Sequence, residues 1–349
     1  MLKKKAIMIG AGLANMAGAV YLIQEGNWNG KDITFYALDT HGANDGSTAS
    51  EAAEEYWNKN HPMENTKGFI ARGGRMLNYR TYVDLMDLLD RIPSVTEPGM
   101  TAAEDTRDFD SKHRTYDKAR LLQGGKGIVD GHKLGLNNLD RILLSRLVMM
   151  PDNQEEKLDN VTIAEYFEDS PHIFQTNFWY MWETTFAFRT QSSAQELRRY
   201  MHQMIYEFTQ IEHLVGVNRT RYNQYESIML PLIKYLEGQG CNFVMNRRVT
   251  DFEFKNTPMQ DEITVTGLEM ENIEQGTVEH VTVDDETVVF FTNGSITDSA
   301  TLGDFNTPAP ENMDYGAASS LWKKACERFY NLGLSLIHIS EPTRRSYIS

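Results

Sequence analysis

The sequence predicts an α/β fold in which a nucleotide-binding domain with a parallel sheet is interrupted by a mainly helical domain. Three observations predict it. A strand, a glycine turn, a helix and a second strand open the chain, helical spacing fills its centre, and strand patterns return near its end. One domain split by an insertion explains this order better than two consecutive domains, and 349 residues are enough for either arrangement.

The opening unit spans about 35 residues, which is the length that a βαβ unit requires. Residues 5–9 predict a short buried strand. Residues 13–25 predict a helix that Gly26 closes, and residues 33–38 predict the next strand. This order is typical of the first half of a Rossmann-like domain.

The following segment is poor in apolar periodicity. Residues 40–75 are rich in Gly, Asn and Ser and are interpreted mostly as loop, and residues 97–135 are polar with glycine-rich turns. We expect helices over residues 52–57, 80–91, 138–149 and 161–167, the last of them capped by Asn160 or Thr162.

The centre of the chain is helical and its end is rich in strands. Residues 196–214 form the clearest amphipathic pattern, and residues 227–237 predict a second helix that Gly238 ends. Alternating patterns then predict strands over residues 242–245, 249–254, 263–269, 278–283 and 288–291.

Composition excludes several classes of function. The net charge is −15, with 34 basic against 49 acidic residues, and this argues against a nucleic-acid partner, which needs clustered positive charge. The apolar runs are too short for a membrane span of about 20 residues. Two cysteines and no ligand-type spacing predict neither a disulfide framework nor a metal site, and they favour a reducing, cytoplasmic compartment.

The first motif with chemical meaning is Gly10-x-Gly12-x-x-Asn15, between the first strand and the first helix. Gly10 permits a tight turn, Gly12 lets a pyrophosphate approach the backbone, and the helix N-terminus supplies N–H donors. Asn15 stands where the third glycine of the pattern is expected. Asp39, after the second strand, is the candidate for the ribose hydroxyls. The alternative for the glycine motif is a turn without a ligand, and the alternative for Asp39 is an ordinary turn residue.

Two further loops suit a cofactor. Arg72-Gly73-Gly74-Arg75 combines mobile glycines with arginines that bind phosphate or carboxylate in a bidentate manner. Thr292-Asn293-Gly294-Ser295 is a small polar turn directly after a predicted strand, where backbone contact with a cofactor is favourable. A solvated surface turn and a simple loop are the respective alternatives.

Aromatic residues gather in the centre of the chain. Residues 178–188 contain six aromatic side chains, which suit either the wall of an apolar ligand cavity or a packed core. Tyr200 lies beside the apolar stripe of the predicted 196–214 helix. Its hydroxyl could donate a proton in a cavity, although such a tyrosine more often packs and bonds locally.

Taken in order, these motifs resemble the oleate hydratase family, also called the myosin-cross-reactive antigens, over residues 3 to about 333. The motifs are Ile-Gly-Ala-Gly-Leu-Ala-Asn (9–15), Gly-Ala-Asn-Asp-Gly (42–46), Ala-Arg-Gly-Gly-Arg (71–75), Thr-Thr-Phe-Ala-Phe (184–188), Arg-Arg-Tyr-Met (198–201), Tyr-Asn-Gln-Tyr-Glu-Ser (222–227) and Phe-Thr-Asn-Gly-Ser (291–295).

The resemblance implies a bacterial, FAD-dependent hydro-lyase. Such an enzyme adds water across the cis-9 double bond of an unsaturated fatty acid, oleate or linoleate, and forms a 10-hydroxy fatty acid. FAD has a structural and electrostatic role there, with no net redox change. The resemblance also implies a homodimer and peripheral contact with membranes. A flavin-dependent lipid oxidoreductase, a fatty-acid double-bond isomerase and a non-catalytic flavin- and fatty-acid-binding fragment are the alternatives.

The resemblance also implies roles for individual residues. Tyr200 is the expected proton donor. Met76 stands where the family has a water-activating glutamate, and a thioether cannot act as a base. The residues expected to bind FAD are Gly10, Gly12, Asn15, Asp39, Asp45, Gly46, Arg72, Gly73, Gly74, Arg75, Val249, Asn293, Gly294 and Ser295.

The predicted domain organisation follows from the patterns and the resemblance together. After residue 333 the family pattern stops, and residues 334–349 look like translated sequencing-adaptor sequence, so we expect a C-terminally truncated chain. The predicted parts are residues 1–150 (FAD-binding domain with a flavin-lid loop at 71–77), 151–237 (helical substrate domain), 238–305 (return to the FAD-binding domain), 306–333 (start of a truncated substrate region) and 334–349 (non-native tail).

Overall fold

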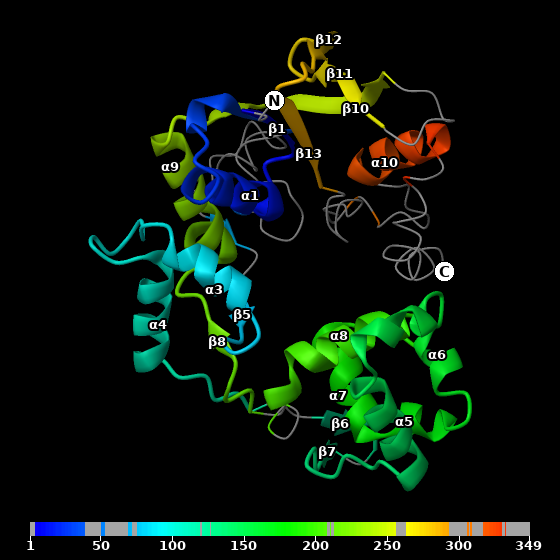
Figure 1. The fold of residues 1–349 in the computed structure, drawn as a ribbon. Helices are drawn as coiled ribbons and strands as arrows, with labels where there is room; N and C mark the ends of the chain where they lie inside the picture. Colours follow the sequence, from blue (N-terminus) through cyan, green and yellow to red (C-terminus); the bar gives the residue numbers. More distant parts are fainter. Residues whose placement is uncertain are drawn as a thin grey trace. The chain divides into compact units, whose positions relative to one another are not determined.

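The computed structural model of the chain divides into two units (Figure 1). The first unit comprises residues 1–75, 84–109 and 220–330, and the second comprises residues 76–83, 110–219 and 331–349. The structure describes residues 4–38, 50–52, 69–71, 75–118, 121–125, 127–207, 210, 213–255, 263–292, 306, 308, 317–329 and 332.

The first unit combines strands and helices. Its elements are β1 (Lys5–Ile9), α1 (Leu13–Gln24), the 3-10 helix η1 (Gly30–Asp32), β2 (Ile33–Tyr36), β3 (Ser50–Ala52), β4 (Phe69–Ala71), α3 (Val83–Asp90), α4 (Ala102–Lys112), the π-helix η6 (Tyr225–Met229), α9 (Leu230–Gly238), β9 (Asn242–Val244), β10 (Arg247–Phe254), β11 (Val265–Asn272), β12 (Thr277–Thr282), β13 (Thr287–Phe291) and α10 (Ala317–Arg328). α3 starts and α4 ends at the boundary with the second unit.

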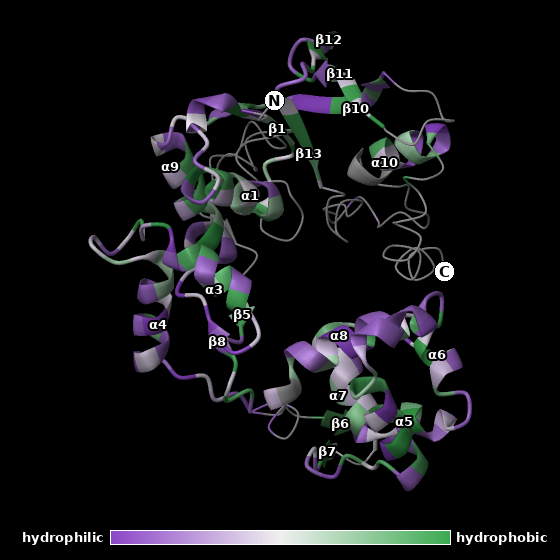
Figure 2. Cartoon of the chain, viewed as in Figure 1, coloured by the Kyte–Doolittle hydropathy of each residue, from purple (hydrophilic) through white to green (hydrophobic). Residues whose placement is uncertain are grey.

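A parallel sheet of order β13-β1-β2-β9 forms the centre of the first unit. β1 pairs in parallel with β13 on one side and with β2 on the other, in the registers Ala6↔Val288 and Ala6↔Ile33. β1 is buried from its second residue to its last, and β13 is coloured as hydrophobic (Figure 2). Such continuous apolar strands are typical of parallel sheets that are covered on both faces. The predicted α/β fold is therefore confirmed.

The other strands of the first unit form smaller sheets. β10, β11 and β12 pair in antiparallel order, and α10 packs against β10. β3 pairs with β4. The strands predicted over residues 242–291 are all observed, with their ends shifted by a few residues.

The second unit is mainly helical. Its elements are β5 (Met76–Leu77), β6 (Leu121–Gln123), β7 (Gly127–Val129), α5 (Asn138–Val148), η3 (Asp152–Leu158), α6 (Ile163–Tyr166), η4 (Pro171–Gln175), α7 (Asn177–Phe186), α8 (Ala194–Gln203), η5 (Ile205–Glu207) and β8 (Asn218–Arg219). A buried apolar cluster runs through α5, α6, α7 and α8 and includes Leu147, Phe167, Trp182 and Met201. Among the described residues of the whole chain, no helix is both long enough and apolar enough to cross a bilayer.

The predicted helix over residues 196–214 is wrong in its second half. α8 ends at Gln203, and a single 3-10 turn follows it. The buried Glu207 carboxylate accepts hydrogen bonds from the Gly216 N–H at 3.0 Å and from the Asn78 amide at 3.4 Å. A continuous helix would hold residues 207 and 216 about 13 Å apart along its axis, so this contact requires the chain to turn back.

Other local predictions also need correction. The polar segment 97–135 contains α4 and the β6–β7 hairpin, because charged residues on α4 hide its helical period. Ala52, expected in a helix, ends β3, and the remaining residues of that predicted helix lie outside the described ones. Thr162, not Asn160, caps α6.

Gly26 is required for a reason other than the predicted one. The left-handed residue after α1 is Asn27, with φ of 55°. A Cβ atom on Gly26 would lie 2.7 Å from the Leu22 carbonyl oxygen and 2.9 Å from the Trp28 ring. Close packing, and not backbone conformation, therefore explains this glycine.

Candidate functional site

The glycine turn lies at the carboxyl end of β1, in the middle of the parallel sheet. Gly10 has φ of +91°, which side chains other than glycine rarely adopt, and its N–H donates to the Tyr36 carbonyl at 2.8 Å. Gly12 is the N-cap of α1, with no side chain to cap the helix, and the first turn of α1 has no acidic residue. The N-terminus of α1 therefore carries no negative side chain in its first turn.

The Asn15 side chain holds this turn in place through two hydrogen bonds. Its buried amide nitrogen donates to the carbonyls of Ile9 at 2.8 Å and of Gly10 at 2.9 Å. Both carbonyls belong to the strand end and the turn, so Asn15 fixes the path of the backbone between β1 and α1. A glycine at this position would make neither bond.

The end of β13 lies beside the same turn. A Cβ atom on Gly10 would lie 3.8 Å from the Thr292 hydroxyl oxygen, which directly precedes the predicted cofactor residues Asn293, Gly294 and Ser295. Those three residues lie outside the described ones. The other predicted cofactor residues outside the described ones are Asp39, Asp45, Gly46, Arg72, Gly73 and Gly74.

The donor set of the turn fits the pyrophosphate of a dinucleotide. Gly10 adopts the positive φ that such a turn needs, and Gly12 puts no side chain over the start of α1. Helix N-termini stabilise anions through their N–H groups and their dipole. Ligands of open parallel sheets bind at the carboxyl ends of the strands, which is where this turn lies.

Arg75 and Met76 follow the predicted flavin-lid loop. The Arg75 N–H donates to the Thr220 hydroxyl at 2.8 Å, and its carbonyl accepts from the Thr220 N–H at 3.1 Å. The Arg75 side chain is exposed. Met76 is half-buried in β5 and pairs with Arg219 of β8. The loop therefore ends in a backbone ladder, while the role of Arg75 in holding a cofactor stays a prediction.

Tyr200 lies on α8 against an aromatic wall. Its ring makes edge contacts with Phe186 at 5.7 Å and with Phe188 at 5.3 Å between ring centroids, and 37% of the residue is exposed. The packed-core alternative describes what the structure shows for the aromatic segment: Phe178, Trp182 and Phe188 are buried in the core of the second unit, and Phe186 packs against it. The wall of a ligand cavity stays a prediction.

Val249, the remaining predicted cofactor residue, is buried in β10 and pairs with Met270 of β11. It belongs to the first unit, as the glycine turn does, whereas Met76 and Tyr200 belong to the second unit. Within the first unit, the structure thus brings together Gly10, Gly12, Asn15 and Thr292, whereas Val249 lies in another sheet of that unit.

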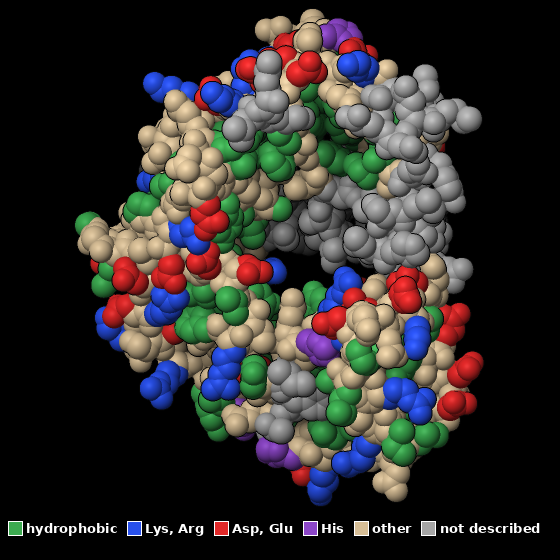
Figure 3. Space-filling model, in the orientation of Figure 1, with side chains coloured by type: hydrophobic (Ala, Val, Ile, Leu, Met, Phe, Trp, Pro, Cys, Tyr) green, Lys and Arg blue, Asp and Glu red, His purple; other side chains and the backbone are tan. Residues whose placement is uncertain are grey.

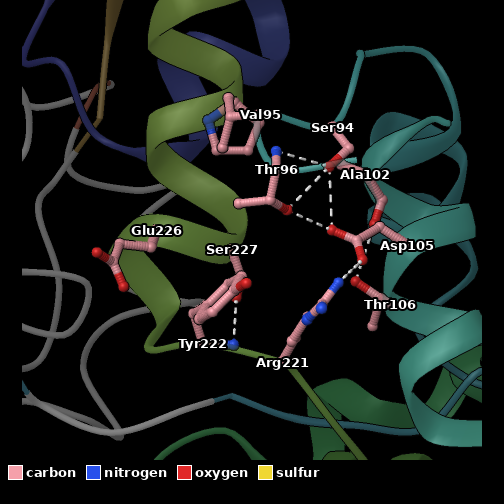
Figure 4. Close-up of a pocket in the computed structure, with 11 residues that line it drawn as sticks. Ser94, Val95, Thr96, Ala102, Asp105, Thr106, Arg221, Tyr222, Glu226 and Ser227 are labelled. Atoms are coloured by element: carbon pink, nitrogen blue, oxygen red, sulfur yellow. Dashed lines mark hydrogen bonds and ion pairs between the residues drawn. The ribbon is translucent and has the colours of Figure 1, made fainter. Parts of the chain in front are cut away.

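Sequence reasoning missed a polar cluster around Arg221, directly before the Tyr222–Ser227 motif. Figure 4 shows the Arg221 guanidinium pointing at Asp105, and it bonds to Asp105 at 2.9 Å and to Glu97 at 2.7 Å. Ser94 and Thr96 donate to the second oxygen of Asp105.

The cavity inside this cluster has a volume of only about 10 Å³, which is room for one water molecule. The cluster therefore holds the start of the π-helix η6 in place and is too small for a lipid. An arginine followed by a tyrosine gives no sequence signal for such a network, because Glu97 and Asp105 come from a distant segment.

A second missed residue is Glu196, one turn before Tyr200 on α8. It is half-buried, and burial raises its pKa while the nearby charge of Arg199 lowers it. The only available sequence signal is the Ser193-x-x-Glu196 spacing, which normally indicates a capping box and not a functional group.

The sequence of the chain is similar to those of two curated hydratases. Linoleate hydratase of Lactiplantibacillus plantarum is 77% identical over 333 residues, which are 95% of this chain and 58% of that protein. Oleate hydratase of Streptococcus pyogenes serotype M49 (strain NZ131) is 31% identical over 339 residues, which are 95% of this chain and 52% of that protein. The chain spans about half the length of these curated relatives.

Solved structures resemble the chain only remotely. An oxidoreductase from Methanosarcina mazei has a TM-score of 0.42 at 11% identity, with 83% of this chain and 59% of that chain covered. Rab GDI from Plasmodium falciparum has a TM-score of 0.38 at 12% identity, with 82% and 65% covered. The fold assignment rests on the parallel sheet of the chain itself.

The family model agrees with the sequence relatives over almost the whole length. It is described as the MCRA family, and it matches residues 3–349. The glycine turn, the Tyr200 helix and the motifs between them all lie inside this match. This chain therefore belongs to the MCRA family, the family of the oleate hydratases.

Proposed function

We propose that the chain is the flavin-binding part of a fatty-acid hydratase, a hydro-lyase that adds water to the cis-9 double bond of oleate or linoleate and gives a 10-hydroxy fatty acid. The observation that carries this proposal is the family match, together with the names of the two hydratase relatives. The glycine turn at the carboxyl end of β1 supports a dinucleotide cofactor.

FAD is the cofactor that we propose. Gly10 and Gly12 would hold its pyrophosphate and Asp39 its ribose, with the other predicted residues around them: Asn15, Asp45, Gly46, Arg72, Gly73, Gly74, Arg75, Val249, Asn293, Gly294 and Ser295. Bound FAD supplies a polar wall for the reaction without net redox change. Asn15 acts through the turn, because its amide is committed to the carbonyls of Ile9 and Gly10.

The proposed chemistry needs a proton donor in dry surroundings. Tyr200 donates a proton to one alkene carbon, and water bonds to the neighbouring carbon. Phe186 and Phe188 pack on the Tyr200 ring and supply apolar surface on that side of it. The helices of residues 151–237 supply the acyl-chain pocket in this proposal. Met76 cannot take the proton that the attacking water releases.

Met76 is also the observation that favours a second candidate function. A chain without a base at this position could bind flavin and fatty acid without turning the lipid over. That candidate predicts bound ligand and no product, even in Met76→Glu.

The test is an anaerobic incubation of the FAD-loaded protein with oleate or linoleate under reducing conditions, followed by mass spectrometry. Hydration gives a product heavier by one water. A shifted double bond at unchanged mass would show an isomerase, and a lost double bond without added oxygen would show an oxidoreductase. Bound fatty acid without any product would support the non-catalytic candidate.

The assembly and the membrane contact implied by the family are part of the same proposal. We propose a homodimer that takes its substrate from a membrane surface. Analytical ultracentrifugation at micromolar concentration checks the dimer, and co-sedimentation with lipid vesicles checks the contact. A monomer that stays in the supernatant contradicts both.

A further inference from the structure

Three helices of the second unit begin with an N-cap residue and an acid three positions later, and they do not use the acid in the same way. On α5, Asn137 and Asp140 close a complete capping box, and on α6 Thr162 and Glu165 do the same. Glu165 accepts from the N–H and from the hydroxyl of Thr162, both at 2.8 Å. In both helices the carboxylate is consumed by the helix start.

The box of α8 is open. Ser193 accepts from the Glu196 N–H at 3.3 Å, which is the first half of the motif. Among the hydrogen bonds and ion pairs of the described residues, none involves the Glu196 carboxylate, so the return bond to Ser193 is not made. The carboxylate that closes the capping box in α5 and in α6 therefore makes no such bond in α8.

Glu196 and Tyr200 share one face of α8. Residues four apart in a helix stand one above the other, with their Cβ atoms about 5–6 Å apart. Glu196 is half-buried, and the Tyr200 ring beside it is walled by Phe186 and Phe188. This face thus presents a carboxyl group and a phenol side by side next to an aromatic wall.

The other charged groups of α8 are engaged elsewhere. Arg198 is buried and bonds to Asp152 and Glu155 on η3, and Arg199 bonds to the same Glu155. His202 contacts the Val148 carbonyl at 2.7 Å, at the end of α5. Arg199 is the charge that acts on Glu196, and its guanidinium is held by the Glu155 carboxylate.

We propose that Glu196 is the proton acceptor of the hydration reaction and works with Tyr200 as an acid–base pair in place of the glutamate that Met76 replaces. This inference rests on the proposed hydratase function and adds a residue to it. A pair at i and i+4 on one helix is positioned by the helix itself, so neither group depends on the loop that ends at Met76.

The step balances without a further reactant. The Tyr200 hydroxyl gives its proton to one alkene carbon, and the oxygen of a water molecule bonds to the adjacent carbon. The water proton passes to the Glu196 carboxylate, and the resulting carboxylic acid returns it to the Tyr200 phenolate. The alkene has gained one water, and both side chains have recovered their starting states. Partial burial raises the Glu196 pKa, which makes the carboxylate a better base.

The experiment compares Glu196→Gln with its matched control Glu165→Gln in the FAD-loaded protein. Both variants remove an acid three residues after an N-cap. Glu196→Gln should lower kcat about 100-fold with KM unchanged, and Glu196→Asp should restore part of the loss. Glu165→Gln should leave kcat within about twofold, because its carboxylate serves only the start of α6 and a glutamine there can still close the capping box. Hydration that persists in Glu196→Gln overturns the inference and leaves the hydratase proposal intact.

A second readout does not depend on turnover. In protein with 13C-labelled Glu carboxyl groups, the Glu196 signal is identified by its absence in Glu196→Gln, and its titration is followed by NMR. Tyr200→Phe should raise the Glu196 midpoint by about 1 pH unit, because a phenol hydroxyl beside the carboxylate stabilises its charged form and phenylalanine cannot. Tyr180→Phe on α7 is the control and should not move it. An unmoved midpoint in Tyr200→Phe overturns the pair, and a moved midpoint in protein without turnover supports the pair while contradicting the hydratase proposal.

Discussion

The glycine turn of the first unit presents backbone groups, whereas the Tyr200 helix of the second unit presents side-chain groups. The turn is made of backbone: a positive φ at Gly10, a bare N-cap at Gly12 and an amide at Asn15 that bonds to carbonyls. The α8 region is made of side chains, with a phenol, a carboxyl group and aromatic rings. A site made of backbone fixes the residue type at a few positions, because only glycine or a specific side chain allows the required conformation. In a site made of side chains, a nearby residue with the same functional group can take over a role.

Tyr200→Phe should give the largest effect on the side-chain site. Loss of the proposed proton donor is expected to lower kcat by about 100- to 10,000-fold, with the ring contacts to Phe186 and Phe188 preserved. Single-turnover formation of the hydroxy acid measures it. Tyr180→Phe, which removes another exposed hydroxyl, should change nothing. Full activity in Tyr200→Phe would place the proton donor elsewhere.

The two glycines of the turn should separate binding from folding. Gly12 has φ of −78°, so Gly12→Val puts no strain on the backbone conformation and is expected to lose FAD, because the side chain would occupy the proposed pyrophosphate position. Gly10→Ala should instead lose about 1–2 kcal/mol of stability, because alanine is strained at φ of +91°. Flavin fluorescence and urea unfolding measure the two effects. Equal effects of both variants on both readouts would break the distinction.

Asn15→Ala tests a side chain that serves the backbone site. It leaves the buried carbonyl of Ile9 and the partly buried carbonyl of Gly10 without their amide donor, and about 1–3 kcal/mol of stability should be lost. FAD affinity should fall only as far as the turn loosens. Differential scanning calorimetry measures the first effect and flavin titration the second. Loss of all FAD binding at unchanged stability would show instead that Asn15 contacts the cofactor.

Asp140 gives the smallest predicted effect and concerns a closed capping box. Burial alone would raise its pKa, but hydrogen bonds from Ser170, the Asn137 N–H and His172 outweigh it, so the pKa is lowered. A carboxyl group with a lowered folded pKa stabilises the fold above its unfolded pKa, which is near 3.8. That stability is lost as the pH falls from there through the folded pKa.

Asp140→Asn should accordingly flatten the acid limb of a plot of melting temperature against pH below about pH 4. The Asp140→Asn and wild-type curves should run parallel above pH 6. A difference that grows above neutral pH would contradict this origin.

The sequence revealed the backbone site better than the side-chain site, for physical reasons. The parallel strands and the turn depend on local apolar runs and on glycines, so the α/β fold and the place of Gly10 and Gly12 could be predicted. The engagement of Asn15 with two carbonyls could not, because it depends on the approach of α1 to β1. The end of α8 at Gln203 was also hidden, since the apolar spacing continues beyond it and no local pattern announces the Glu207–Gly216 hydrogen bond, for which the chain must turn back.

The state of the Glu196 carboxylate could not be predicted from the sequence either. Its spacing to Ser193 is identical to that of Glu165 to Thr162, and no local pattern separates an open box from a closed one. The sequence around Arg221 likewise gives no sign of its ion pairs, because its partners Glu97 and Asp105 lie more than 100 residues earlier.

The parallel sheet has a consequence for synthesis. β2 follows β1 at once, but β13, the other neighbour of β1, is made only after the whole helical unit. At about 5–20 residues per second, the buried strand β1 waits on the order of 15–60 s with one edge unpaired. The apolar edge of β1 is therefore exposed while the residues between β1 and β13 are synthesised. Any delay in the helical region lengthens the period in which a wrong strand can occupy the place of β13.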